Sequence, residues 1–98
     1  MPTRVTGGVI VQQVESPRLS RLAFRWRYTL AEQVAIDMAE ESHPNVQARH
    51  TLRVLRMSLA EANDVDVTDP RTRQGVEFHA SLGLIAPERV AEILAPQT

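Results

Sequence analysis

The sequence contains no cysteine, so it can form no disulfide, no thiolate metal site and no cysteine nucleophile. It also lacks lysine: all eleven basic side chains are arginines, which can bind carboxylates as a bidentate fork or stack on aromatic rings. Aromatic residues are scarce, and Phe24, Trp26 and Tyr28 are three of the four. No apolar run approaches the roughly 20 residues that a membrane-spanning helix needs. A soluble protein made in a cytoplasm is the resulting expectation.

The length and the placement of charge narrow the possibilities further. The 98 residues allow one small domain, which buries roughly 60–65% of the surface that its unfolded chain exposes. Residues 1–28 hold five Arg against one Glu, a net charge of +4, whereas residues 29–98 hold six Arg against eleven acidic residues, a net charge of −5. The overall charge of −1 argues against a general nucleic-acid binder.

Residues 1–16 predict an extended arm rather than a helix. Gly7 and Gly8 precede the β-branched run Val9, Ile10 and Val11, a composition typical of strands. This segment is too short and too polar for a secretory signal. Two interpretations are open, a frayed terminus and an arm that adds a strand to the sheet edge of a neighbouring subunit.

The next segment predicts a short helix and then a long one. Pro17 is suited to the first position of a helix that ends near Arg27. Thr29 and Glu32 then have the spacing of a capping box, and the helix that they begin stops before His43, which precedes a proline. Five apolar residues of this helix form one stripe at helical spacing, which predicts its core-facing side. They are Leu30, Ala31, Val34, Ala35 and Met38, whereas Ile36 lies on the polar side of the helix.

A second long helix is predicted from about Asn45 to Ala62. Its core stripe consists of Ala48, Leu52, Leu55, Leu59 and Ala62, while Val46, Val54 and Met57 form a separate sector that predicts burial on a second side. A third helix is predicted to begin with Asp69 as cap and Pro70 at its first position, and to end near Leu82 with Gly83 beyond it. A last short helix follows in PERVAEIL.

These elements predict an all-α fold. Residues 17–98 would form a small bundle of three main helices with short flanking helices, behind an extended N-terminal arm in residues 1–16.

Arginines and aromatic residues alternate just before the capping box, and this segment is the main candidate for a docking surface. Trp, Tyr and Arg are the residues most enriched at binding hot spots. The candidate contact residues of the segment are Arg21, Phe24, Arg25, Trp26, Arg27 and Tyr28, with Val9, Ile10 and Val11 of the arm beside them. Trp26 has two possible roles, as an interface residue or as the main anchor of the core.

A second candidate surface is the stripe of Arg49, Arg53 and Arg56 on the second long helix. These arginines share one sector, and two interpretations are open. They can be solvated or paired with the acidic residues of the preceding helix, or they can form an anion-binding or partner-binding face.

The sequence offers no catalytic or metal-binding constellation. The stretch DVDVTD resembles the start of a calcium loop, but the sixth position is Asp69 and the twelfth is Gly75, where a calcium loop requires Gly and Glu. Capping and turn formation explain its acidic residues better. The three histidines lack the spacing of a helical zinc site, and no nucleophile elbow or phosphate loop is present. We therefore expect no enzymatic activity, no metal and no cofactor.

Nucleic-acid binding is the main alternative function. The third helix, Gly83 and PERVAEIL together have the outline of a helix-turn-helix. However, PERVAEIL carries Glu88 and Glu92 against Arg89 alone, and this net negative charge opposes attraction to phosphates. Nucleic acid could instead meet residues 18–28, where arginines and aromatic residues interleave.

Two longer stretches carry the most specific pattern in the sequence. RLAFRWRYTLAEQVAI follows a pattern F-R-x-R-[FY]-T-x-x-E-x-V-A-I, and VDVTDPRTRQGVEFHASLGLIAPERVAEIL follows V-D-[LV]-x-D-P-R-T-x-x-G-V…G-[LI]-[IL]…R…[AE]-I-L. Together they cover about 45 of the 98 residues and resemble small proteins of tailed bacteriophages that are often encoded beside tail and tail-fibre genes. The sequence departs from the pattern at Trp26 and His79, and the arm lies outside it.

The resemblance implies a virion or tail-associated protein without catalytic residues. We therefore expect a non-enzymatic structural protein, an adaptor or decorating subunit of the tail or tail fibres, made in the host cytoplasm and located in the virion. Its expected partners are other virion proteins, tail or tail-fibre subunits among them, with the chain present in multiple copies. A small nucleic-acid-binding regulator and a tail-fibre assembly chaperone are the alternatives.

Overall fold

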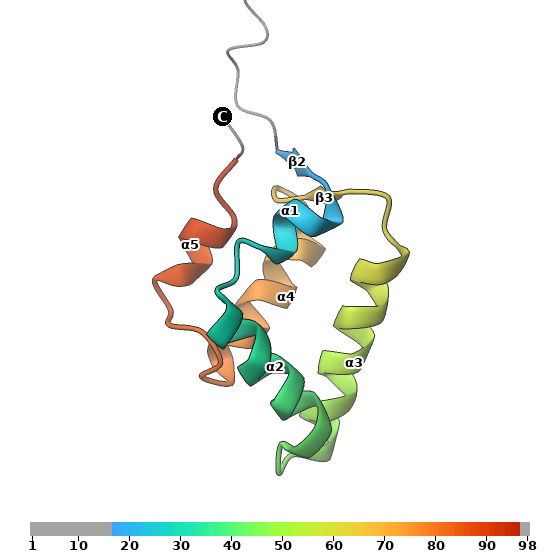
Figure 1. The fold of residues 1–98 in the computed structure, drawn as a ribbon, viewed down its shortest axis with the longest axis vertical. Helices are drawn as coiled ribbons and strands as arrows, with labels where there is room; N and C mark the ends of the chain where they lie inside the picture. The colour runs from blue at the N-terminus through green and yellow to red at the C-terminus, as the bar shows by residue number, and fades with distance from the viewer. Residues whose placement is uncertain (1–16, 97–98) are drawn as a thin grey trace, which may run out of the picture.

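The computed structural model describes residues 17–96, so the predicted arm with Val9, Ile10 and Val11 lies outside the described residues. The order of the elements along the chain is shown in Figure 1. Their bounds are β2 Arg18–Leu19, α1 Arg21–Arg25, α2 Leu30–Ser42, α3 Val46–Glu61, β3 Val65–Asp66, α4 Pro70–Ser81 and α5 Arg89–Ile93. The structure is mainly helical, as the sequence predicts, but the two short strands β2 and β3 depart from the predicted all-α fold.

Side-chain caps start the two longest helices where the sequence predicts them. Thr29 Oγ1 accepts a hydrogen bond from the backbone N–H of Glu32 at 3.1 Å, and the Glu32 carboxylate accepts one from the N–H of Thr29 at 2.7 Å. This capping box satisfies two backbone donors that an uncapped helix would leave without partners. Asn45 caps α3 in the same way, through the N–H of Ala48 at 3.1 Å.

The acidic stretch before α4 has the capping and turn roles that its sequence predicts. Asp66 accepts hydrogen bonds from the backbone N–H and the hydroxyl of Thr68, at 2.9 and 2.6 Å. Asp69 caps α4 by accepting from the N–H of Arg71 at 2.8 Å. At the other end of the helix Gly83 has φ +76°, a backbone conformation that side chains with a Cβ rarely adopt.

The prediction that Pro17 begins a helix is wrong. Ser20 caps α1 instead, and the preceding Arg18–Leu19 pairs antiparallel with Val65–Asp66 as a two-stranded sheet. The sequence shows no obvious second strand downstream, because Val65 lies in a turn-rich segment. The paired residues are 46 and 48 positions apart in the chain, so this pairing depends on the tertiary fold.

One hydrophobic core receives side chains from every element of the described residues. Leu19 of β2, Phe24 of α1, Val65 of β3, Val76 of α4 and Ile93 of α5 are buried in it. The longer helices α2 and α3 contribute the partly buried residues Ile36 and Leu59. In Figure 1 α2 and α3 descend from this core and meet at the loop that joins them, and the two helices are in contact.

The two apolar sectors of α3 have different environments. The predicted core stripe is confirmed, because Ala48 and Leu52 are buried and its remaining members are partly buried. The second sector is not covered: Val46, Val54 and Met57 are each about half exposed. The prediction that α3 is buried on two sides is therefore wrong for the chain by itself.

Candidate docking surface

Helix α2 turns its predicted core stripe toward solvent. Leu30, Val34 and Met38 are 64%, 49% and 60% exposed, whereas Ala39 is buried and Ile36 packs against the core. The sequence pattern places Ile36 on the polar side of the helix, so the prediction for this helix is wrong. The residues on the inner side, Glu32, Ile36 and Ala39, lie four and three positions apart and therefore share the opposite face.

An ion pair and a close helix contact account for this orientation. Arg89 of α5 donates to both Glu32 oxygens, at 2.9 and 3.0 Å, so the first turn of α2 must face α5. Ala39 is the buried residue of α2, Ala48 is one of the two buried residues of α3, and the two helices are in contact. Small residues let two helices approach closely, whereas Leu30 and Met38 would hold them apart.

The same arginine joins α5 to the segment before α2. Arg89 also donates to the backbone carbonyl of Arg27 at 2.6 Å and pairs with Glu92 in its own helix. The hydrogen bonds from Arg89 hold the pKa of Glu32 below its usual range, because they favour the ionised carboxylate. Arg89 of α5 therefore contacts both the first turn of α2 and the segment that precedes it.

The aromatic residues of the candidate docking segment are divided between the core and the surface. Phe24 and Tyr28 are buried, with their rings edge-to-face at a centroid distance of 5.9 Å. Trp26, between them in the chain, is 60% exposed and is therefore not a core anchor. Of these three rings only that of Trp26 offers substantial contact area to a partner. Whether the segment binds one stays a prediction.

Tyr28 forms a polar contact inside the core. Its hydroxyl lies 2.8 Å from Nδ1 of His79, and the two rings meet edge-to-face. Burial raises the pKa of Tyr28 and lowers that of His79 to about 4, so both side chains are neutral near pH 7. The Tyr28 hydroxyl can then donate to the ring nitrogen.

The arginines of the segment tie it to the rest of the molecule. Arg21 donates to the backbone carbonyl of Ala60, and Arg27 donates to the carbonyls of Ile93, at 3.0 Å, and Ala95. Arg25 donates to the side chain of Gln33 at 3.1 Å. Arg21 and Arg25 remain exposed and can still present positive charge to a partner, whereas Arg27 is partly buried.

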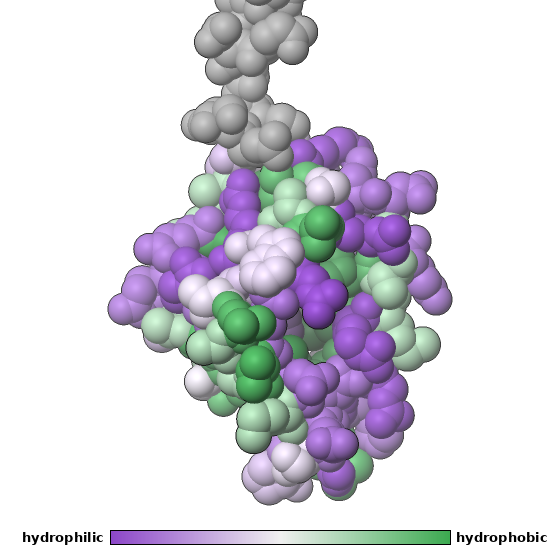
Figure 2. All heavy atoms as spheres, viewed as in Figure 1, coloured by the Kyte–Doolittle hydropathy of each residue, from purple (hydrophilic) through white to green (hydrophobic). Residues whose placement is uncertain are grey.

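We name the large exposed apolar residues between Leu22 and Met38 the outer stripe, which runs from α1 through its C-cap residue Trp26 to α2. They occur at every fourth position and are Leu22, Trp26, Leu30, Val34 and Met38, each about half exposed or more. Figure 2 shows hydrophobic side chains gathered over α2 on the face where α1 and α2 lie in front. Contiguous apolar surface of this kind, bordered by polar residues, is typical of an interaction site.

The two ends of the outer stripe carry opposite charges. Arg21 and Arg25 are exposed beside its N-terminal end, and Asp37 and Glu41 are exposed near its C-terminal end. Glu41 follows Val34 by seven residues, so it lies on the same face of α2. The outer stripe is therefore bordered by positive charge at one end and by negative charge at the other.

One arginine of the α3 stripe, Arg56, pairs with an acidic residue of α2. Arg56 pairs with both oxygens of Glu40, and these bonds hold the pKa of Glu40 below its usual range. Arg53 shares a shallow hollow of about 230 Å³ with acidic residues of α2. Arg49 is partly buried, and its Nε atom has no hydrogen-bond partner within residues 17–96. Pairing with α2 therefore accounts for Arg56, while an anion-binding or partner-binding role for the stripe stays a prediction.

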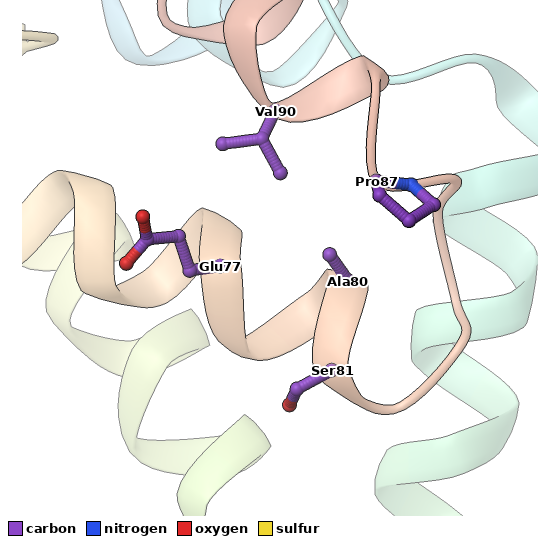
Figure 3. A pocket seen from close by; sticks show the side chains of 5 residues that line it. All are labelled: Glu77, Ala80, Ser81, Pro87 and Val90. Atoms are coloured by element: carbon purple, nitrogen blue, oxygen red, sulfur yellow. The ribbon is translucent and has the colours of Figure 1, made fainter.

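A larger hollow lies between α4 and α5. It has a volume of about 470 Å³, and Figure 3 shows Ala80 and Val90 pointing into it from facing elements. The other lining residues are Glu77, Ser81 and Pro87. The Ser81 hydroxyl donates to the backbone carbonyl of Phe78, so no nucleophile is paired with a base here.

Comparison with known proteins gives no relative: no family model, no curated protein and no solved structure matches the chain. Within residues 17–96, no group of three or more His, Cys, Asp or Glu side chains could hold a metal ion. None of the helices in that range is both long enough and apolar enough to cross a membrane.

Proposed function

We propose that the chain is a non-enzymatic structural protein of a tailed bacteriophage, an adaptor or decorating subunit of the tail or its fibres. The outer stripe is the observation that carries the docking role. Five apolar side chains stay exposed on α1 and α2 although their chain has a core in which to bury such residues. The assignment to a phage rests on the resemblance of the two sequence blocks.

Contacts between these two blocks support treating them as one unit. Tyr28 and Glu32 of the first block contact His79 and Arg89 of the second. Arg27 is bonded to the carbonyl of Ile93 as well. These contacts between the two blocks account for a sequence pattern that extends over both of them. The outer stripe takes no part in these contacts and remains available to a neighbouring protein. We further propose that residues 1–16 form an extended arm, which adds contacts to this docking surface.

Mass spectrometry of purified particles of the encoding phage tests the role in the virion. We expect the chain to be present in mature particles at several copies per particle. Its absence from mature particles would contradict a permanent structural role. Co-purification with an isolated fibre, together with absence from the particle, would identify an assembly chaperone instead.

Substitutions test whether the outer stripe makes the contact. We expect Trp26→Ala to reduce incorporation into particles while leaving the melting temperature of the isolated protein nearly unchanged, because Trp26 is 60% exposed. Val54→Ala on α3 is the matched control, since Val54 is 59% exposed but lies outside the stripe. Equal incorporation of the two variants would contradict docking through Trp26.

A nucleic-acid-binding regulator has weaker support from the geometry. Only Trp26 among the three rings of the segment is exposed for stacking, and Arg89 of α5 is engaged by Glu32 and Glu92. A gel-shift experiment at about 50 mM salt distinguishes the two functions, because phosphate contacts are strong at low salt. Retention of single- or double-stranded DNA by micromolar protein would favour the regulator.

A further inference from the structure

The outer face of α2 has a charge pattern that complements itself. Exposed Arg21 and Arg25 are next to Leu22 and Trp26 in the chain, and exposed Asp37 and Glu41 lie near the other end of the outer stripe, where they also line the hollow that contains Arg53. If a second identical surface is turned end for end, each positive end meets a negative end. A parallel arrangement would place like charges together and is disfavoured.

The apolar side chains have the same kind of symmetry. Val34 is the midpoint between Leu30 and Met38, four residues from each, and all three are about half exposed or more. In an antiparallel arrangement about Val34, Leu30 of one copy would lie opposite Met38 of the other. The helix dipoles of two antiparallel α2 helices would also be favourably arranged.

We propose that the occupant of the outer stripe is a second copy of this chain, packed as a twofold-symmetric dimer with its α2 helices antiparallel about Val34. A twofold interface uses the same patch on both subunits, which requires a self-complementary surface of this kind. This inference rests on the proposed docking role of the outer stripe and does not depend on the assignment to a phage.

The size of the surface indicates a weak dimer. Leu30 to Met38 span only about 12 Å along the helix axis, and Leu22 and Trp26 lie beyond the N-terminal end of α2, toward the C-terminal end of the partner's α2. Stable complexes bury roughly 800 Å² per partner with about 20–30 residues on each side, and the outer stripe has far fewer residues than that. We therefore expect a dissociation constant of about micromolar order.

Analytical ultracentrifugation of the full chain over a concentration series tests the proposal. We expect a concentration-dependent change from monomer to dimer. Val34→Arg would abolish the dimer, because the twofold axis brings two identical charges together at its centre. Met57→Arg, at a 48% exposed apolar residue of α3, is the matched control and would leave the dimer intact. Circular dichroism verifies that both variants are folded.

Charge reversal tests the antiparallel arrangement itself. We expect Arg25→Glu and Glu41→Arg each to weaken the dimer several-fold, since each places like charges at both ends of the interface. The double variant reverses both ends at once and would restore the wild-type affinity. Failure of the double variant to restore affinity would overturn the antiparallel arrangement, as would equal loss from Met57→Arg and Val34→Arg.

A chain that stays monomeric at every concentration would overturn the dimer and leave the outer stripe to a different protein. This result would not affect the role in the virion, which is tested by the composition of particles. Conversely, a dimer that is absent from particles would contradict the proposed function and leave the interface established. The two failures are therefore distinguishable.

Discussion

The more hydrophobic face of α2 is exposed to solvent, whereas its less hydrophobic face is turned toward the rest of the protein. The outer face carries Leu30, Val34 and Met38, all exposed, whereas the inner face places Ile36 and Ala39 against the rest of the protein, with Glu32 at its start. Burial of a large apolar side chain is worth roughly 1.5–3 kcal/mol, so burying the outer face would give more stabilisation within one chain. In the observed orientation α2 instead has the charged bond of Glu32 to Arg89 and the contact with α3. Apolar surface left outside in this way is available to a partner.

The aromatic residues just before α2 repeat this division over a shorter distance. Tyr28 is buried and bonded to His79, while Trp26, two residues earlier, is 60% exposed. Both are large aromatic side chains, and they lie two residues apart in the same segment. Replacing each by alanine therefore compares a buried position directly with an exposed one in the same local sequence.

The largest effect is expected at the inner site. Tyr28→Ala removes a buried ring and leaves the ring nitrogen of His79 without its hydroxyl partner, so we expect a loss of about 3–5 kcal/mol in the free energy of unfolding. Trp26→Ala should change that free energy by less than about 1 kcal/mol at a concentration where the chain is monomeric. Urea denaturation followed by circular dichroism measures both.

A smaller change at the same position separates the ring from its hydroxyl. Tyr28→Phe retains the ring and removes only the hydrogen bond, for which we expect a loss of about 1 kcal/mol. If Trp26→Ala destabilised the monomer as much as Tyr28→Ala, the division into an inner and an outer site would be wrong.

The sequence predicts the ends of the helices much better than the direction of their faces. Thr29 and Asp69 cap helices through backbone groups two or three residues away, so short sequence patterns are sufficient to locate them. The orientation of α2 depends on Glu32 meeting Arg89, 57 residues further along the chain. No local or periodic sequence pattern predicts that Glu32 pairs with Arg89. The apolar stripe of α2 would predict the opposite orientation of the helix.

The candidate site was predictable only in part for the same reason. Alternation of arginine and aromatic residues draws attention to residues 21–28, but it does not distinguish Trp26 at the surface from Phe24 and Tyr28 in the core. The part of the outer stripe on α2 was visible in the sequence as an apolar helical face. Its assignment to the core was wrong because a single helix pattern shows which residues share a face, and not what covers that face.

Acid should weaken the inner side through His79. Burial lowers the pKa of His79 to about 4 from its ordinary value of 6.5, so the unfolded chain binds more protons between these values. This contribution to stability is complete above pH 6.5 and is lost as the pH falls toward 4, by about 2 kcal/mol at pH 5. Urea titrations at pH 7, 6 and 5 measure the loss.

Substitution of single histidines identifies the group responsible. His79→Gln should remove most of the pH dependence between about 4 and 6.5, because glutamine does not titrate. His50→Gln is the matched control for the substitution, since His50 is exposed on α3. The pKa values of Glu32 and Glu40 are held below their usual range, so their contributions are lost only at lower pH. An unchanged slope in His79→Gln would show that His79 is not desolvated in the folded protein.

The smallest expected difference compares two ion pairs that α2 makes with other helices. Glu32 bonds Arg89, whose side chain is 24% exposed, whereas Glu40 bonds Arg56, whose side chain is 59% exposed. Solvent screens the second pair more strongly. Glu32→Gln keeps the size of the side chain but weakens its bonds to Arg89, and we expect it to cost about 1 kcal/mol. Glu40→Gln should cost less. Thermal denaturation at low and high salt measures both variants, and a larger loss for Glu40→Gln would mean that contact with α3, rather than the pair with Arg89, sets which face of α2 is turned inward.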